Sequence, residues 1–341
     1  HESKEQEQGG KQTALHHDVA LLSMIRKQDR LSINLSQTAA HCKANPPCVN
    51  AGFGIYYISM EKSACGQEEL PMKLMVIDGN SILNRAYYGI RPLTTRDGLY
   101  THAIFGFLTT LLRLEGEEAP DALCVTFDVH APTFRHQASE AYKATRKPMP
   151  EELRVQVPVL KEVLDALNIP RYEQEGWEAD DLIGTISRKC EADGWDCVVV
   201  TGDKDSLQLI TDHTMVKLVS TRMGQTTTKD MTETAFQEQY GFAPIHMIDL
   251  KALMGDSSDN IPGVPGIGEK TAMALIQQYE SIDNLYAKMP DIEAKPAAIR
   301  KLAEGEESAR ESYWLATIVT DAPLDFHPEE NLCRKPGPDA Y

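Results

Sequence analysis

The sequence predicts an α/β fold, in which a mostly parallel central sheet is flanked by helices and followed by a helical subdomain. Three short apolar runs, at 73–77, 122–127 and 196–201, have the length and composition of buried strands. Strands that alternate with helices are typical of βαβ units and a parallel sheet. Helical patterns of ten or more residues separate these runs, at 102–114, 150–167 and 178–192.

The remaining elements follow from the same spacing rules. The segment 215–219 is expected to add an edge strand. After about residue 230 the strand-like runs stop, and the C-terminal third becomes a helical subdomain. Its predicted helices span 232–240, 244–254, 270–279, 297–302 and 306–318.

These elements divide the chain into four parts. Residues 1–71 begin polar, include a short amphipathic pattern at 19–25 and end without clear periodicity, so we expect an unassigned extension, disordered or artefactual, before a natural start at Met72. Residues 72–229 form the α/β domain and 230–327 the helical subdomain. Residues 328–341 resemble a linker, because this stretch contains Lys-Pro-Gly-Pro.

Composition limits the function classes. The 341 residues carry 51 acidic and 34 basic side chains, a net charge of −17, which by itself argues against a nucleic-acid partner. No apolar run reaches the ~18–20 residues of a membrane span, and the chain starts without a signal-peptide pattern. The seven cysteines form no C-x-x-C pair. We therefore expect a soluble protein of the reducing cytoplasm, with no membrane association.

Carboxylates follow three of the predicted strands near the point where each strand ends. These are Asp78, Asp128 and Asp203. One such aspartate is also explained as a turn former or a helix cap. Because the carboxyl ends of parallel strands meet at one edge, where open α/β sheets bind ligands, three together favour a functional site.

Nine carboxylates in five clusters are candidates for this site. No histidine or cysteine accompanies them at matching positions, and hard oxygen ligands suit Mg²⁺ or Mn²⁺ but not Zn²⁺. The set exceeds the needs of one octahedral ion, so two ions about 3.5–4 Å apart, as in hydrolytic phosphoryl transfer, are the hypothesis. The nine are Asp78, Asp128, Glu178, Asp180, Asp181, Asp203, Asp205, Asp256 and Asp259.

Two further motifs suggest contact with a phosphate backbone. Glycines at Gly263, Gly266 and Gly268 allow a tight turn before a helix, in the order found in helix–hairpin–helix modules that hold duplex backbone. Basic and aromatic residues also gather at 134–136 and 142–147. They form either a solvated helix face or a channel for a single strand, with stacking on Tyr142.

Together these motifs resemble the 5′→3′ exonuclease domain of bacterial DNA polymerase I, within the flap endonuclease superfamily. The similarity runs from about Met72 to His327, in the family's order and spacing. The motifs that carry it are V-I-D-G-N-S at 76–81, V-T-F-D at 125–128, F-R-H at 134–136, Y-K-A-T-R at 142–146, W-E-A-D-D at 177–181, T-G-D-K-D at 201–205, G-D-S-S-D-N-I-P-G-V at 255–264 and G-I-G-E-K-T-A at 266–272.

The resemblance implies a PIN-like sheet, a helical arch at about 131–150 and a helix–hairpin–helix (H3TH) motif in the helical subdomain. It implies that the nine carboxylates form the metal centre, and that Arg85, Lys143 and Arg146 are catalytic groups near the scissile phosphate. Tyr142 would stack on a base, and the hairpin would grip duplex DNA and hold a K⁺ through backbone carbonyls. The DNA-binding residues would be Tyr142, Phe134, Arg135, Gly263, Gly266, Gly268, Lys270 and Thr271.

The function implied is hydrolysis of DNA phosphodiesters with two Mg²⁺ ions, for which Mn²⁺ could substitute. Substrates would be 5′-flap, nicked or 5′-ended duplexes, as in primer removal, nick translation and repair in the bacterial cytoplasm, associated with the nucleoid. The chain would be monomeric and a fragment, with a polymerase domain in cis. A stand-alone flap endonuclease stays open as an alternative, and so do a PIN-like ribonuclease and a non-catalytic DNA-binding module.

Overall fold

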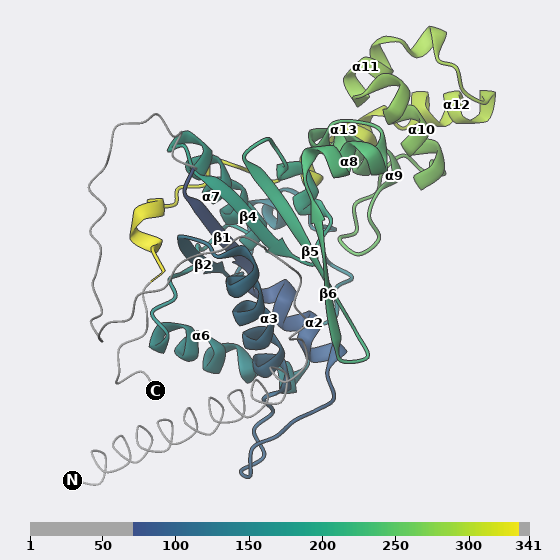
Figure 1. The fold of residues 1–341 in the computed structure, drawn as a ribbon. Coiled ribbons are helices and arrows are strands. Elements are labelled where there is room, and N and C mark those ends of the chain that lie inside the picture. Colours follow the sequence, from purple (N-terminus) through teal and green to yellow (C-terminus); the bar gives the residue numbers. More distant parts are fainter. Residues whose placement is uncertain (1–70, 334–341) are drawn as a thin grey trace, which may run out of the picture. The chain divides into compact units, whose positions relative to one another are not determined.

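The computed structural model describes residues 71–333, which belong to one compact unit of the chain (Figure 1). The predicted N-terminal extension, up to residue 70, and the last eight residues of the predicted linker lie outside the described residues. In 71–333, no helix is both long and apolar enough to cross a membrane.

A six-stranded sheet with the order β3-β2-β1-β4-β5-β6 forms the centre of this unit. The first five strands run parallel, and only β6 is antiparallel to its neighbour β5. The mostly parallel sheet is therefore confirmed. The strands are β1 (Lys73–Asp78), β2 (Ala122–Thr126), β3 (Arg171–Tyr172), β4 (Asp196–Thr201), β5 (Thr214–Arg222) and β6 (Gln225–Met231).

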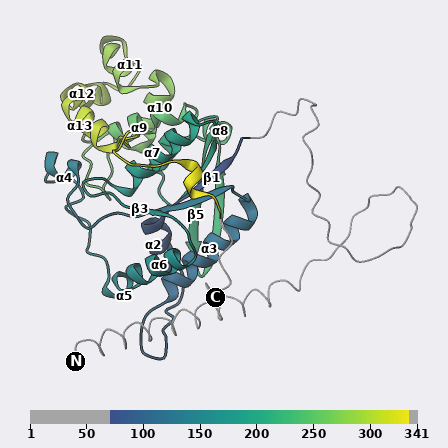
Figure 2. The same cartoon turned by 90° about the vertical axis from the view of Figure 1, so that its left-hand side faces the viewer.

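Helices cover both faces of the sheet. On one face, α2 (Gly79–Gly89) packs on β1, β2 and β5, and α3 (His102–Glu118) packs on α2. On the other face, α7 (Ala179–Ala192) packs on β1, β2 and β4. The two views show α2 and α3 on the opposite side of the strands from α7 (Figures 1 and 2).

Alternation along the buried strands builds the core. Leu74 and Val76 of β1 point to the same face, since side chains two apart on a strand share a face. They belong to one buried apolar cluster with Leu182, Ile183 and Ile186 of α7. The same cluster continues into the helical region, so the α/β part and that region share one core.

The helical region begins after β6 and returns to the sheet at its end. It contains α8 (Glu233–Tyr240), α9 (Met247–Met254), α10 (Glu269–Tyr279), α11 (Ile282–Ala287), α12 (Pro296–Glu304) and α13 (Glu306–Ala316). After α13 an extended segment runs along α7. Ala322 N–H donates to Thr185 Oγ1 at 3.0 Å, and Lys189 Nζ donates to the Leu324 carbonyl at 2.6 Å. These bonds tie the helical region to α7.

Several predicted elements differ from those observed. The helix predicted at 150–167 is two helices, α5 (Glu151–Arg154) and α6 (Gln156–Ala166). Pro158 explains the break, because it has no N–H for the carbonyl four residues earlier and its ring crowds that carbonyl. The strand predicted at 215–219 is longer and lies inside the sheet, because β6, a polar strand, forms the edge. Within 131–150 the structure has one short helix, α4 (Phe134–Ala138), and then turns.

Candidate active site

The site lies where the strand order of the sheet reverses, between β1 and β4. At this position the loops after the two strands diverge and leave a crevice. Asp78 ends β1 and begins α2 as its N-cap, where it accepts a hydrogen bond from Ser81 N–H at 2.9 Å. Its other oxygen accepts from Thr201 Oγ1, at the end of β4, at 2.7 Å. The side chain is thereby fixed at the crevice.

Asp128 and Asp180 reach the same crevice from β2 and α7. Asp128 accepts from Asn80 Nδ2 and from the N–H of Ala179, both at 2.8 Å. The second bond holds the start of α7, and with it Asp180, against the sheet edge. A cavity of about 450 Å³ is lined by Asp78, Asp128, Asp180 and Asp203, together with Lys143 and Arg146.

We call Asp78, Asp128, Asp180 and Asp203 the unpaired carboxylates. Within 71–333, none of the four makes an ion pair with a lysine, arginine or histidine. Burial raises the pKa of Asp78 to about 7 and outweighs the hydrogen bonds from Ser81 and Thr201, which lower it; the charges of Asp128 and Asp203 add a smaller rise. Burial and the charges of Asp78 and Asp203 also raise the pKa of Asp180 well above its ordinary value. Asp78 and Asp180, whose ionisation is hindered by burial and by neighbouring acids, form a site that a cation would stabilise.

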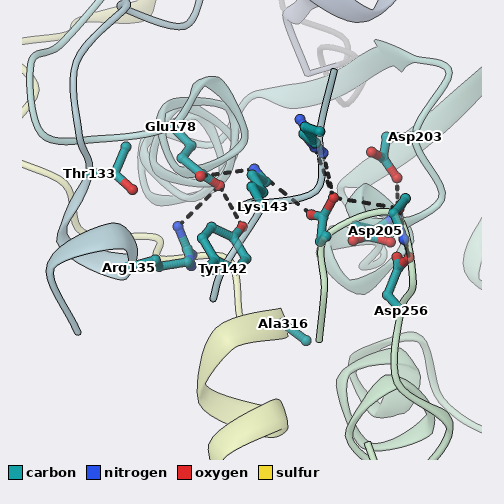
Figure 3. A network of polar contacts seen from close by, with 12 residues as sticks. Thr133, Arg135, Tyr142, Lys143, Glu178, Asp203, Asp205, Asp256 and Ala316 are labelled. Atoms are coloured by element: carbon teal, nitrogen blue, oxygen red, sulfur yellow. Dashed lines mark hydrogen bonds and ion pairs between the residues drawn. The ribbon is translucent and has the colours of Figure 1, made fainter. Parts of the chain in front are cut away.

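The other five carboxylates already have cationic partners, and we call them the paired carboxylates. Glu178 accepts from Lys143 Nζ at 2.8 Å and from the Tyr142 hydroxyl at 3.1 Å. Asp259 accepts from Arg146 Nη2 at 2.5 Å. Figure 3 shows Lys143 and Tyr142 turned toward Glu178, with Arg135 beside them.

Asp181 is the most deeply buried of the paired carboxylates. Its two oxygens accept from the two terminal nitrogens of Arg135, each at 2.8 Å, and one of them also accepts from Val319 N–H at 2.9 Å. Asp181 is 0% exposed and Arg135 is 2% exposed. This pair joins α4, α7 and the segment after α13, and it does not reach the cavity of the unpaired carboxylates.

Asp205 and Asp256 share one lysine, Lys251 of α9. Burial and nearby Asp203 raise the pKa of Asp205 to about 7 even with this lysine beside it. For Asp256 the hydrogen bonds from Lys251 and Ser258 outweigh partial burial and lower the pKa to about 2. The three residues line a second cavity, of about 630 Å³, which extends from Asp203 to Glu269 at the start of α10. Sequence reasoning missed Lys251, because nothing in a largely apolar helix marks it.

The predicted catalytic cations lie near the site. Lys143 and Arg146 line the cavity of the unpaired carboxylates. Arg85 of α2 donates to the carbonyl of Gly202, directly before Asp203, and lines the second cavity. Sequence reasoning missed Tyr88, which is 72% exposed and lines the first cavity. Its position on α2, ten residues after Asp78, gave no distinctive signal.

Two residues predicted to contact DNA, Tyr142 and Arg135, are buried, and a third, Phe134, is half-buried. Tyr142 is 4% exposed, and Arg135 is held by Asp181. Phe134 packs against Trp177 and Trp314, with ring centroids 5.2 and 5.8 Å away. Stacking of a base on Tyr142 would therefore require this segment to move.

The predicted hairpin forms a tight turn before α10. Gly263 has φ 60°, and a Cβ there would lie 2.3 Å from the backbone nitrogen of Gly255, so no other residue fits. Its carbonyl accepts from Ser308 Oγ at 2.6 Å, and the carbonyl of Gly266 accepts from Lys301 Nζ at 3.1 Å. Gly268 is the N-cap of α10, whose first turn exposes Lys270 and Thr271 to solvent.

Comparison with known families gives two adjoining matches. Residues 73–241 match the 5'-3' exonuclease N-terminal resolvase-like domain, and residues 242–339 match the 5'-3' exonuclease C-terminal SAM fold. DNA polymerase I of Bacillus subtilis is 44% identical over 253 residues, which cover 74% of this chain and 28% of the relative. DNA polymerase I of Caldicellulosiruptor bescii is also 44% identical, over 76% of this chain and 30% of the relative. The chain thus spans less than a third of these relatives.

Solved structures support the fold. A bacteriophage T5 5′-exonuclease structure with bound zinc has a TM-score of 0.58 at 23% identity and covers 72% of this chain and 89% of that chain. A T5 flap endonuclease complex with DNA and metal ions has a TM-score of 0.57 at 23% identity, over 73% and 90%. The expected fold class is confirmed, and the two family matches confirm the resemblance. The chain belongs to the 5′→3′ exonuclease family, and it is similar to the part of bacterial DNA polymerase I that these matches cover.

Proposed function

We propose that the chain hydrolyses DNA phosphodiesters from a 5′ end or at a 5′ flap, with divalent cations as cofactors. One observation carries this proposal. Four carboxylates that form no ion pair within residues 71–333 line a cavity at the switch point of the sheet, and the same cavity is lined by Lys143 and Arg146. Carboxylates that can bind a metal ion, next to basic side chains that can bind a phosphate, suit phosphodiester hydrolysis.

The donor set fits divalent cations such as Mg²⁺ or Mn²⁺. It consists of carboxylate oxygens, which such hard ions prefer, and the raised pKa values of Asp78 and Asp180 indicate unbalanced negative charge. In 71–333 no three acidic, histidine or cysteine side chains lie close enough together to hold an ion as they stand, so binding would draw the carboxylates inward. A bound divalent cation supplies an activated water and stabilises the leaving oxygen.

The unpaired carboxylates would hold the first ion. A second ion, as the two-ion hypothesis requires, would have to compete with Lys251 for Asp205 and Asp256, or with Lys143 and Arg146 for Glu178 and Asp259. The T5 relatives support divalent cations in general, because their structures contain metal ions. The preference for Mg²⁺ and the K⁺ at the hairpin remain predictions.

The chain's own cations would bind the reacting phosphate. Lys143 and Arg146 would offset charge on its oxygens, and this kind of electrostatic stabilisation contributes much of the rate in phosphoryl transfer. The exposed Lys270 and Thr271, at the N-terminus of α10, would contact the backbone of the duplex. Both roles use phosphate and not base edges, so the enzyme would choose substrates by shape.

We further propose that the chain is the nuclease part of a bacterial DNA polymerase I, with the polymerase in cis. The relatives are more than three times as long as the matched region, which supports this context. A stand-alone flap endonuclease would share the chemistry. The reading frame beyond residue 341 distinguishes the two.

The test is cleavage of a 5′-labelled flap duplex with Mg²⁺ or with EDTA. The proposal predicts cleavage only with the metal, and loss of it in Asp203→Ala but not in Asp325→Ala, an exposed aspartate outside the site. Binding without cleavage would favour a DNA-binding module, and cleavage of RNA but not DNA would favour a ribonuclease. Full activity of Asp203→Ala would remove that residue from the site.

A further inference from the structure

The loop that carries Asp256 and Asp259 is closed on itself. Asp256 N–H donates to the Ile261 carbonyl at 2.9 Å, and Ile261 N–H donates back at 2.8 Å. Ser258 adds bonds from its N–H and its hydroxyl to the Asp256 carboxylate, at 2.7 and 2.6 Å. The loop leads directly into the hairpin at Gly263. It is therefore a stiff connection between the duplex-binding hairpin and the site.

Neutral hydrogen bonds join this loop to the segment that carries the catalytic cations. Asn260 Nδ2 donates to the carbonyl of Ala141 at 2.7 Å, and Lys143 N–H donates to the carbonyl of Asp259 at 2.8 Å. Neither bond involves a charged group. Both can persist when the side chains of Lys143 and Arg146 leave Glu178 and Asp259 to meet a phosphate.

The backbone at both ends of this connection is unusual. Asn260 has φ 57° and Lys143 has φ 54°, the left-handed region that residues with a Cβ rarely adopt. Asparagine tolerates this region better than most residues, whereas lysine does not. Such conformations persist only where surrounding contacts enforce them, and they concentrate at functional sites.

We propose that Asn260 is a positioning residue, whose side-chain amide clamps the segment 141–146 to the loop 255–261 and so aims Lys143 and Arg146 at the scissile phosphate. The amide acts on the reaction only through these two cations. The inference rests on the proposed function, because positioning has meaning only if the chain cleaves phosphodiesters. It assigns a role to a residue of the 255–264 motif that neither metal binding nor the hairpin uses.

The main test is Asn260→Gly, which keeps the left-handed backbone accessible and removes the amide. The matched control is Asn168→Gly, because Asn168 also has φ 57° but is exposed after α6, away from the site. On the flap duplex with Mg²⁺, we expect kcat of Asn260→Gly to fall about tenfold or more, since small misplacement of catalytic groups is costly. Duplex affinity without divalent cations should change less than twofold, and the control should match wild type.

Non-additivity separates positioning from a structural role. In a Lys143→Ala/Arg146→Ala background, Asn260→Gly should add no further loss of kcat, because the groups it positions are gone. A second variant, Asn260→Asp, keeps the size and backbone preference but removes the donor, and it should lose kcat to a similar degree. If Asn260→Gly fails to fold, Asn260→Asp takes its place in both backgrounds.

A readout without substrate or metal makes the inference independent of activity. Trypsin should cut after Lys143 and Arg146 several times faster in Asn260→Gly than in wild type or Asn168→Gly, because the clamp no longer limits local opening. Unchanged trypsin cutting and unchanged kcat in Asn260→Gly would overturn the clamp. The clamp would also be overturned if Asn260→Gly lowered kcat by the same factor in the Lys143→Ala/Arg146→Ala background as in wild type. If wild type does not cleave DNA at all, the proposed function fails, whatever the trypsin result.

Discussion

The unpaired and the paired carboxylates look alike in the sequence but differ in the fold. Asp180 and Asp181 are neighbours, yet Asp180 faces Asp78 and Asp203, whereas Asp181 is enclosed by Arg135. An acid with an internal cation holds segments together, and one without a partner depends on a cation from solution. The difference separates acids that shape the site from acids that would bind the metal.

The largest effect on activity is expected when an unpaired carboxylate loses its charge. Asp180→Asn should lower kcat by about a thousandfold or more, because a ligand is lost where charge stabilisation dominates the rate. Folding should be unaffected or improved, since the variant removes repulsion with Asp78 and Asp203. Flap cleavage with Mg²⁺ and urea unfolding without metal measure the two parts. If Asp180→Asn kept its activity or was strongly destabilised, the division into unpaired and paired carboxylates would be wrong.

The paired carboxylate Asp181 should show the opposite pattern, with its main effect on stability. Asp181→Ala leaves Arg135 buried and without its main partner, which typically costs about 3–5 kcal/mol. Urea unfolding measures this loss. The control is Arg135→Met with Asp181→Leu, which removes both charges and should cost much less. Equal destabilisation by the single and the double change would show that packing, and not the charge pair, is decisive.

Lys143→Ala should lower kcat about a hundredfold, because one cation near the phosphate is removed. Duplex affinity, measured by titration without divalent cations, should fall only slightly, since Lys143 lines the cavity of the unpaired carboxylates and is not among the residues proposed to hold the duplex. Equal loss of rate and affinity would make Lys143 a grip on DNA and not a catalytic group.

The most gradual of the expected effects is the pH dependence of stability without metal. The pKa of Asp78 rises from 3.8 to about 7 on folding, so the folded state binds a proton more tightly than the unfolded state between these values. Stability should therefore fall as pH rises from about 4 to about 7, by at most about 1.4 kcal/mol per pH unit for this group. Urea unfolding across this range, with Asp78→Asn as the control, measures the slope. A slope that Asp78→Asn leaves unchanged would assign it to other groups.

Local patterns predicted the fold well where one signal dominated. The strand β4 has the predicted bounds, because a run of valines between turn residues has no competing explanation. The break between α5 and α6 was missed although Pro158 marks it, because the apolar spacing continues across the proline. The strand β6 was missed because its residues are polar and lack a strand-like apolar pattern. They form a strand only because they pair with β5.

The sequence nominated nine acids for the site but did not show how the fold divides them. The strand ends and the family motifs selected all nine acids as candidates. Which acids are paired depends on Arg135, Lys143, Arg146 and Lys251. Each of these cations contacts an acid that lies tens of positions away in the sequence. No spacing rule in one sequence reports such contacts. The burial of Tyr142 against Glu178 was hidden for the same reason.

Calorimetric titration of Mn²⁺ into wild type, Asp180→Asn and Asp256→Asn compares the two groups directly. If the unpaired carboxylates form the tighter metal site, Asp180→Asn loses the tight binding event. Asp256→Asn, in which a paired carboxylate is changed, keeps that event with an affinity close to that of wild type. Tight binding that survives Asp180→Asn and disappears in Asp256→Asn would contradict this assignment and place the metal among the paired carboxylates.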